Sequence, residues 1–187
     1  DSLRRLRNAA GPEVLPPADA QLAAYRDAAL PWLQQAARAG VGFVSDPGTG
    51  GLADHHHPSL DDQAEALARE LVEPLRDRVA RAVGSSDDAE DPSVVGERLR
   101  AVYRQWKVQH VEESARHHVM AAFSTGAFEA TPAVATLQWL VDDDGHCPDC
   151  DDNALAGPTA KGEPFPTGQL HPPAHPGCRC LLVPVNG

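Results

Sequence analysis

The chain has 187 residues, an apolar content of 42% and few aromatic residues (5%), a size that suits one domain with a small appendix. Its formal net charge of −11 disfavours general binding to nucleic acid or to acidic membranes. The sequence has no signal peptide and no apolar run approaching the about 18 residues that span a bilayer. Because the chain begins at Asp1 and not at Met, we expect further residues to precede it.

The first part of the chain, residues 1–132, is predicted to form a helical body. Apolar residues recur at helical spacing over 20–39, 60–83 and 93–129. Pro31 is expected to kink or divide the first helix, and Pro74 to bend the second. The following residues are expected to fill the core of this body: Leu67, Leu71, Leu75, Leu99, Val102, Trp106, Val119 and Phe123.

Histidines occur at two places in the predicted body. The run at 55–57 lies in a segment rich in Gly and Pro, and we interpret it as part of a solvated loop. His110 and His117 are seven residues apart and share a face of the third helix. A polar helix face explains this pair more simply than a metal site does.

The pattern changes after Pro132. The segment 136–141 is short, apolar and aromatic, and it predicts a strand; 180–184 predicts a second one. Trp139 is expected to pack at the junction between the body and this tail. The chain is therefore predicted to be α+β: a mainly helical body of long packed helices over 1–132, then a small β-containing Cys/His module over 133–187 with two or three short strands.

All four cysteines lie in this tail. Cys147-Pro-Asp-Cys150 is a knuckle that directs two sulfurs toward one point, and His175-Pro-Gly-Cys178-Arg-Cys180 follows after a loop. Thiols and imidazoles in two short clusters are the donors of a tetrahedral Zn²⁺ site. Cys178 and Cys180 face the same side of an extended strand. His175 competes with one of them for the fourth position, so the candidate ligands are these five residues.

Several interpretations of the cluster remain open. A structural zinc ion would stabilise a tail that is too small for a core of its own. Disulfides are a second interpretation, since four cysteines allow three pairings. Reduced thiols buried as small apolar groups are the third. A catalytic zinc site would need an open position and a general base, and Glu163 is the only glutamate in the tail.

Taken together, the tail resembles the C-terminal module of the phage head morphogenesis family, the Mu F-like minor head proteins. The likeness extends over about residues 108–185 and includes the helix before the module. It rests on these features of the tail: Trp139, an acidic turn, Cys147-x-x-Cys150, Pro172-Pro173, His175-Pro-Gly-Cys178-Arg179-Cys180, and an apolar strand with Pro184. The composition, rich in Ala, Arg, Asp and Pro, is typical of a GC-rich host.

The resemblance implies a minor structural protein of a phage or prophage-derived head and not an enzyme. Such a protein is made in the host cytoplasm, enters the virion in few copies and lies inside the capsid near the portal. It acts in head assembly and in DNA packaging or ejection through contacts with the portal and other head proteins. A structural Zn²⁺ is the expected cofactor, and neither a specific nucleic acid nor a membrane is an expected partner.

Two alternatives belong to other functional classes. The first is a zinc-ribbon-like binding module. The basic patch of nucleic-acid-binding ribbons is missing, because from residue 142 onward Lys161 and Arg179 stand against seven acidic residues. The second alternative is a zinc-dependent enzyme, for which Glu163 would be the candidate base.

Overall fold

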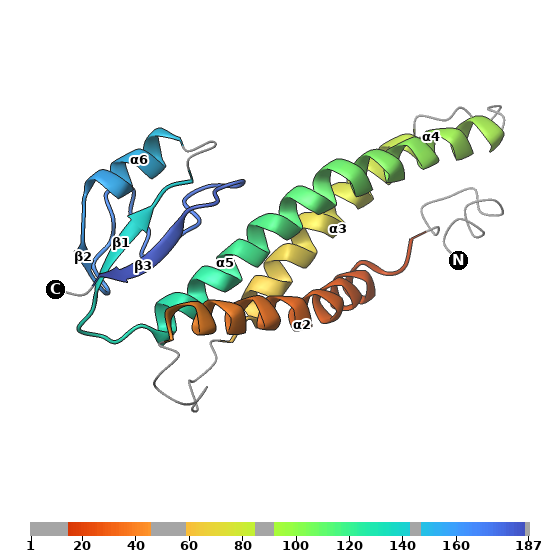
Figure 1. The fold of residues 1–187 in the computed structure, drawn as a ribbon. Coiled ribbons are helices and arrows are strands. Elements are labelled where there is room, and N and C mark those ends of the chain that lie inside the picture. Colours follow the sequence, from red (N-terminus) through yellow and green to blue (C-terminus); the bar gives the residue numbers. More distant parts are fainter. Residues whose placement is uncertain (1–14, 46–58, 85–91, 143–146, 186–187) are drawn as a thin grey trace. The chain divides into compact units, whose positions relative to one another are not determined.

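The computed structural model describes residues 15–45, 59–84, 92–142 and 147–185 (Figure 1). It confirms the α+β class, with packed helices and a small antiparallel sheet near the Cys/His cluster. Within these residues no helix is both long and apolar enough to cross a membrane. The elements are α2 (Ala18–Val44), α3 (Asp61–Gly84), α4 (Pro92–Gln105), a π-helical segment (Trp106–Val111), α5 (Glu112–Ala130), β1 (Thr136–Leu140), α6 (Pro148–Leu155), β2 (Thr159–Ala160) and β3 (Leu181–Val185).

The chain divides into two compact units. Unit 1 consists of Asp1–Ala29 with Ala64–Ala115, and unit 2 of Leu30–Gln63 with Arg116–Gly187. The chain passes from one unit to the other within α2, α3 and α5. The predicted domain boundary at residue 132 lies inside unit 2 and stays a prediction.

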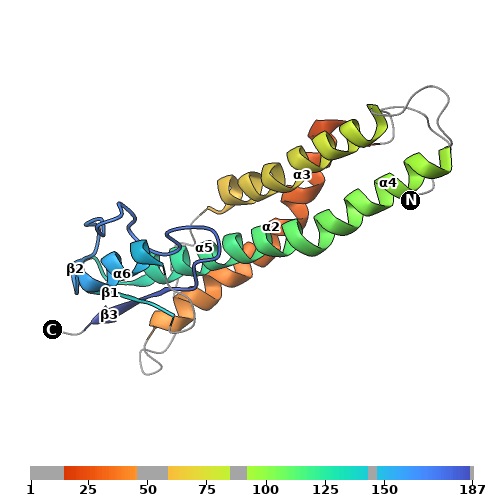
Figure 2. The same cartoon turned by 90° about the horizontal axis from the view of Figure 1, so that it is seen from above.

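Unit 1 has a core between α3 and α4, which lie side by side (Figure 2). Apolar residues on α3 recur every three or four positions and form one buried stripe. The indole Nε1 of Trp106 donates a hydrogen bond to the backbone oxygen of Leu71 at 3.1 Å, so even its polar atom is satisfied. Five of the predicted core residues are buried here: Leu67, Leu71, Leu75, Leu99 and Trp106. A sixth, Val102, is partly buried and packs against them.

The charges at the ends of α3 complement its dipole, and two prolines lie inside helices. Asp61 and Asp62 lie in the first turn of α3 and Arg81 lies in its last turn, so these charges complement the helix dipole. Pro31 lies inside α2 and Pro74 inside α3. Each helix continues past its proline, so of the two expectations for Pro31, a kink or a division, the division does not occur.

The predicted third helix spans 92–130 but contains a π-helical segment between α4 and α5. A π turn holds more residues than an α turn, which changes the face that later residues present. Val119, predicted to be buried, is 40% exposed, and Phe123 is only half-buried. His118 and Ala122 take the buried positions instead.

In unit 2, α2 and α5 approach so closely that only glycine fits at two positions. A Cβ atom on Gly40 would lie 1.9 Å from the backbone oxygen of Phe123, and one on Gly126 would lie 2.0 Å from that of Ala37. Contact at these distances is possible only without a side chain. The two glycines therefore fix where the helices cross.

The sheet has the strand order β2-β1-β3, and both pairs are antiparallel. In the β1–β3 ladder Trp139 is opposite Leu182, and Leu137 is opposite Pro184. Alternation along the strands puts the side chains of Leu137, Trp139 and Leu182 in the core. The two predicted strands lie within a residue of their observed ends. The helix α6 and the strand β2 were not expected, since 151–174 was predicted to be loop.

Trp139 lies at the centre of a second core. It is 1% exposed, and its ring packs edge-on against Phe165 with 5.2 Å between centroids. Phe128 of α5 contacts the same cluster from its border. Trp139 therefore belongs to the core of the module, which also includes three cysteines, and this core contacts the predicted body through Phe128.

Candidate metal centre

The first pair of candidate ligands is positioned by the start of α6. Cys147 precedes the helix with an extended backbone (φ −117°), and Pro148 occupies the first turn, where a proline's missing N–H costs nothing. The backbone N–H of Asp151 donates to the oxygen of Cys147 at 3.0 Å. Cys150 lies one turn into the helix and is 1% exposed. The Sγ atoms of Cys147 and Cys150 are 3.6 Å apart.

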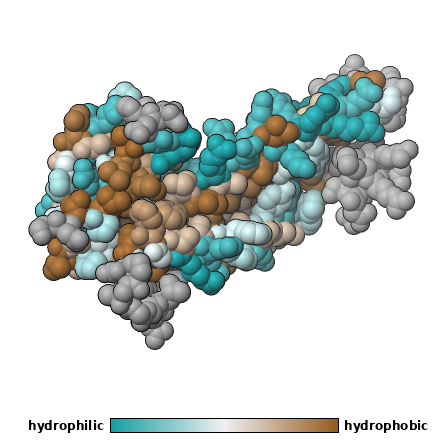
Figure 3. Space-filling view, viewed as in Figure 1, coloured by the Kyte–Doolittle hydropathy of each residue, from teal (hydrophilic) through white to brown (hydrophobic). Residues whose placement is uncertain are grey.

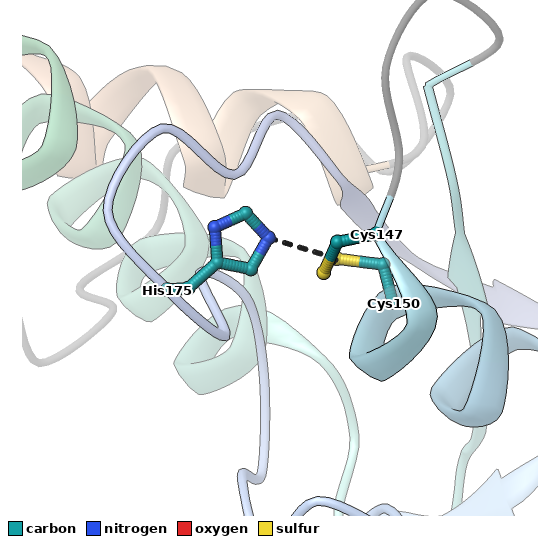
Figure 4. Close-up of side chains that lie close together, drawn as sticks. All are labelled: Cys147, Cys150 and His175. Atoms are coloured by element: carbon teal, nitrogen blue, oxygen red, sulfur yellow. Dashed lines mark hydrogen bonds between the residues drawn. The ribbon is translucent and has the colours of Figure 1, made fainter.

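The second pair comes from a tight turn. The N–H of Cys178 donates to the oxygen of His175 at 3.1 Å, and Gly177 between them has a φ of +82°, which favours glycine. His175 Nε2 lies 3.3 Å from the Sγ of Cys150 (Figure 4). Its other ring nitrogen, Nδ1, lies 2.8 Å from the backbone oxygen of Pro176. Metal-binding histidines commonly have such a carbonyl on the second nitrogen.

All five predicted site residues gather at one place. One group of ligand atoms within 4.8 Å of one another comprises Cys147, Cys150 and His175, and another comprises Cys150, Cys178 and Cys180. Cys150 belongs to both groups, and its Sγ is 3.8 Å from that of Cys178. The four cysteines are free thiols in this structure.

The alternation of side chains between 178 and 180 follows the prediction. Cys178 and Cys180 are 4% and 2% exposed. Arg179 between them is half-exposed and pairs with Asp142 at 2.7 Å, past the end of β1. The two sulfurs therefore face the core, while the arginine anchors the segment from the outside.

The electrostatics of the cluster disfavour isolated thiolates. Burial raises the pKa of the Cys150 thiol well above its usual range, and contacts with Cys180 and Cys147 raise it further. Burial also raises the pKa of Cys180, against a smaller lowering by the indole of Trp139. Among the described residues, the buried Trp139 N–H has no hydrogen-bond partner. Buried thiols of this kind become thiolates when a cation compensates their charge.

A pair that the sequence did not reveal holds the loop around the cluster. Asn153 of α6 is 0% exposed. Its Oδ1 accepts a hydrogen bond from the Thr167 N–H at 3.1 Å, and its Nδ2 donates to Thr167 Oγ1 at 2.8 Å. The spacing of these residues carries no signal of the contact, because it depends on the path of the intervening loop.

The histidines of the helices have other surroundings. His110 Nε2 lies 2.9 Å from the backbone oxygen of Glu70 in unit 1, and the rings of His117 and His118 contact each other with 5.4 Å between centroids in unit 2. The histidines at 55–57 lie outside the described residues. Within the described part of the chain, the two Cys/His groups around Cys150 are the only potential metal clusters.

The donor set determines which ions the cluster can hold. Thiolate and imidazole ligands suit Zn²⁺, Cu⁺ or iron, whereas Mg²⁺ and Ca²⁺ prefer oxygen. The residues present therefore fit the expected zinc ion in chemistry and in spacing. No protein-family model, curated protein or solved structure matches this chain. Its function must be argued from the cluster and its surroundings.

Proposed function

We propose that this chain is a minor structural protein of a phage or prophage-derived head, and that its Cys/His cluster is a structural zinc site. One observation carries the proposal: the cysteines and the histidine of two motifs 25 residues apart (Cys150 to His175) meet at one point. These motifs are also the ones on which the likeness to the Mu F-like proteins rests. Two motifs that meet in a single site support that likeness more strongly than their sequence similarity alone.

Several features favour a structural ion over a catalytic one. The two ligand groups consist of Cys and His alone, and Glu163, the candidate base of an enzyme, is exposed. Structural zinc sites are closed by four protein ligands, whereas catalytic sites leave a position for water. A bound ion would contribute directly to the folding of a module with a small core.

The surface of the module supports a role in protein contacts. Large apolar side chains are exposed on it: Val134 at 95%, Leu155 at 84%, Leu140 at 40% and Leu170 at 40%. In the space-filling view, apolar residues are prominent on its visible face (Figure 3). Exposed apolar surface, where it is contiguous, marks interaction sites. The portal and other head proteins, inside the capsid, are the partners proposed.

The net charge of −11 suits the same location. DNA binding depends on neutralising phosphates with basic side chains. An acidic protein beside the portal would therefore leave packaged DNA free to enter and leave the head. A zinc-ribbon-like nucleic-acid binder would require the opposite charge.

The zinc site is tested by metal analysis of the purified chain together with counting of free thiols. We expect about one zinc ion per chain and thiols that react only after chelation. A chain without metal and without free thiols would contain disulfides, and the zinc site would be abandoned.

The head role is tested in particles of the phage or prophage that encodes the chain. Mass spectrometry of gradient-purified virions should detect the protein at few copies per portal ring. Cross-linking should connect the module to the portal. Absence from purified particles, with the protein present in the lysate, would contradict the proposal.

A further inference from the structure

We propose that Cys147, Cys150, His175 and Cys178 are the four metal ligands, and that Cys180 is a buried thiol outside the coordination shell. The inference rests on the proposed metal centre and selects its ligands, because five donors compete for four positions. Three independent features of the cluster support this selection.

The first feature is that the two ligand pairs have the same local design. Both pairs have the same order of residues: a donor, a proline, one further residue and a cysteine. The two motifs are Cys147-Pro-Asp-Cys150 and His175-Pro-Gly-Cys178. In both, the oxygen of the first residue accepts a backbone hydrogen bond: from the N–H of Asp151, one residue past Cys150, at 3.0 Å, and from the N–H of Cys178 itself at 3.1 Å. Donors three residues apart on a tight turn converge on one point. Cys180 lies outside both turns.

The second feature is the spacing around Cys150. Its Sγ lies 3.6 Å from Cys147 Sγ, 3.8 Å from Cys178 Sγ and 3.3 Å from His175 Nε2. Zinc–ligand bonds of about 2.3 Å to sulfur and about 2.0 Å to nitrogen give tetrahedral edges of about 3.8 Å and about 3.5 Å. The three observed spacings agree with three edges of one tetrahedron that meet at Cys150. Cys180 Sγ also lies within 4.8 Å of the Cys150 and Cys178 sulfurs, so it is the donor that competes with His175, which groups with Cys147 and Cys150.

His175 is in addition prepared to bind through one particular nitrogen. The Pro176 carbonyl oxygen, 2.8 Å from Nδ1, can only accept a hydrogen bond, so Nδ1 carries the proton. The lone pair then lies on Nε2, the nitrogen near Cys150 (Figure 4). This tautomer is the one that a histidine ligand needs.

The third feature is that Cys180 belongs to the core of the sheet. It directly precedes β3, two residues before Leu182, which is paired with Trp139. Cys180 and Trp139 are therefore diagonal neighbours on the inner face, within reach of an aromatic side chain. Cys180 is 2% exposed and, like Cys150 and Cys178, belongs to the same apolar cluster as Trp139; its place beside the indole distinguishes it from those two. A neutral thiol in this position acts as a small apolar group.

The ligand set can be measured on the unaltered full-length chain. X-ray absorption at the zinc edge is expected to give three sulfur and one nitrogen neighbour, and Co²⁺ substitution an absorption spectrum of the Cys₃His type. Four sulfur neighbours would overturn the selection. This measurement does not depend on whether any variant folds.

Two matched variants then identify the sulfur that is not a ligand. Cys178→Ser should weaken Zn²⁺ binding by about a hundredfold or more, because a ligand is lost, whereas Cys180→Ser should change it by less than about threefold. Cys180→Ala provides a second variant in case a buried hydroxyl disturbs folding. Zn²⁺ affinity is read by competition with a chromophoric chelator, and circular dichroism checks the fold.

The possible results separate the inference from the proposed metal centre. If the unaltered chain binds Zn²⁺ but Cys180→Ser and Cys180→Ala lose it as Cys178→Ser does, only the ligand selection is wrong. If the unaltered chain binds no Zn²⁺ or Co²⁺, the metal centre and the selection both fail. Retained binding in Cys180→Ser with loss in Cys178→Ser and a Cys₃His spectrum supports both.

Discussion

Gly40 and Gly42 lie two residues apart on α2 but differ completely in what surrounds them. A Cβ on Gly40 would meet the Phe123 backbone oxygen at 1.9 Å, whereas a Cβ on Gly42 would meet nothing within 4 Å. We expect Gly40→Ala to lower the free energy of unfolding by about 3 kcal/mol, because the helices must separate. Gly42→Ala should raise it by up to about 1 kcal/mol through helix propensity. Urea unfolding measures both, and equal shifts would contradict the crossing.

Asn153 provides a second prediction at the scale of single residues. Asn153→Ala removes the acceptor of the Thr167 N–H and one of two partners of its hydroxyl, the other being Gln169 Oε1. The expected loss is about 1–3 kcal/mol in the free energy of unfolding. Asp152→Ala is the matched control, since Asp152 is exposed on the same helix and should change stability little. Thermal unfolding of the three proteins decides the matter, and a similar effect of both substitutions would reject the role of the pair.

Individual residues could be predicted where chemistry alone selects them. The five candidate ligands could be predicted because Cys and His in short, closely spaced clusters are typical of metal sites. The structure brings them together. Asn153 and Thr167 could not be identified, since their contact depends on a loop path that no local pattern encodes. The prediction that Val119 is buried is wrong because its orientation depends on the π-helical segment before it.

Among the elements, the long helices were predictable and the short elements were not. An apolar stripe that recurs over many turns, as on α3, is consistent with only one kind of element, an amphipathic α-helix. α6 has 8 residues and β2 has 2, too few for a periodic signal to build up. Their positions depend on tertiary contacts: α6 contacts β1, and β2 pairs with the start of β1.

The end of α5 depends on a contact from the strand β2 region. Lys161 Nζ donates to the backbone oxygens of Glu129 (3.3 Å) and Thr131 (2.5 Å) and lies 4.8 Å from the centre of the Phe128 ring. A cation here complements the negative end of the helix dipole. We therefore infer that Lys161 holds the C-terminal end of α5 against the sheet within unit 2.

Replacement of this lysine by methionine keeps the aliphatic stem and removes the charge. Lys161→Met is expected to lower the free energy of unfolding by about 1–2 kcal/mol, because two carbonyl groups lose a charged donor. Lys107→Met removes the same charge from an exposed position and should have an effect below about 0.5 kcal/mol. If chemical denaturation gives the same value for both variants, the contact contributes nothing specific.

At the scale of the whole molecule, the two cores have different chemical origins. The core of unit 1 is formed by aliphatic and aromatic side chains of the helices. The core of the module combines Leu137, Trp139, Phe165 and Leu182 with three of the candidate cysteines. Because candidate metal ligands form part of one core only, removal of the proposed ion should act on that core first.

Hydrogen exchange with and without a chelator tests this difference across the chain. A ligand at about a thousand times its dissociation constant contributes about 4 kcal/mol to the state that binds it. Chelation should therefore raise amide exchange in β1, α6 and β3 by a large factor, while α3 and α4 keep their protection. Cys150→Ser, which removes the candidate ligand shared by both groups, should exchange in the same way with or without chelator. Equal loss of protection in α3 would mean that the metal stabilises the whole chain as one cooperative unit, and the separate cores would then have no thermodynamic independence.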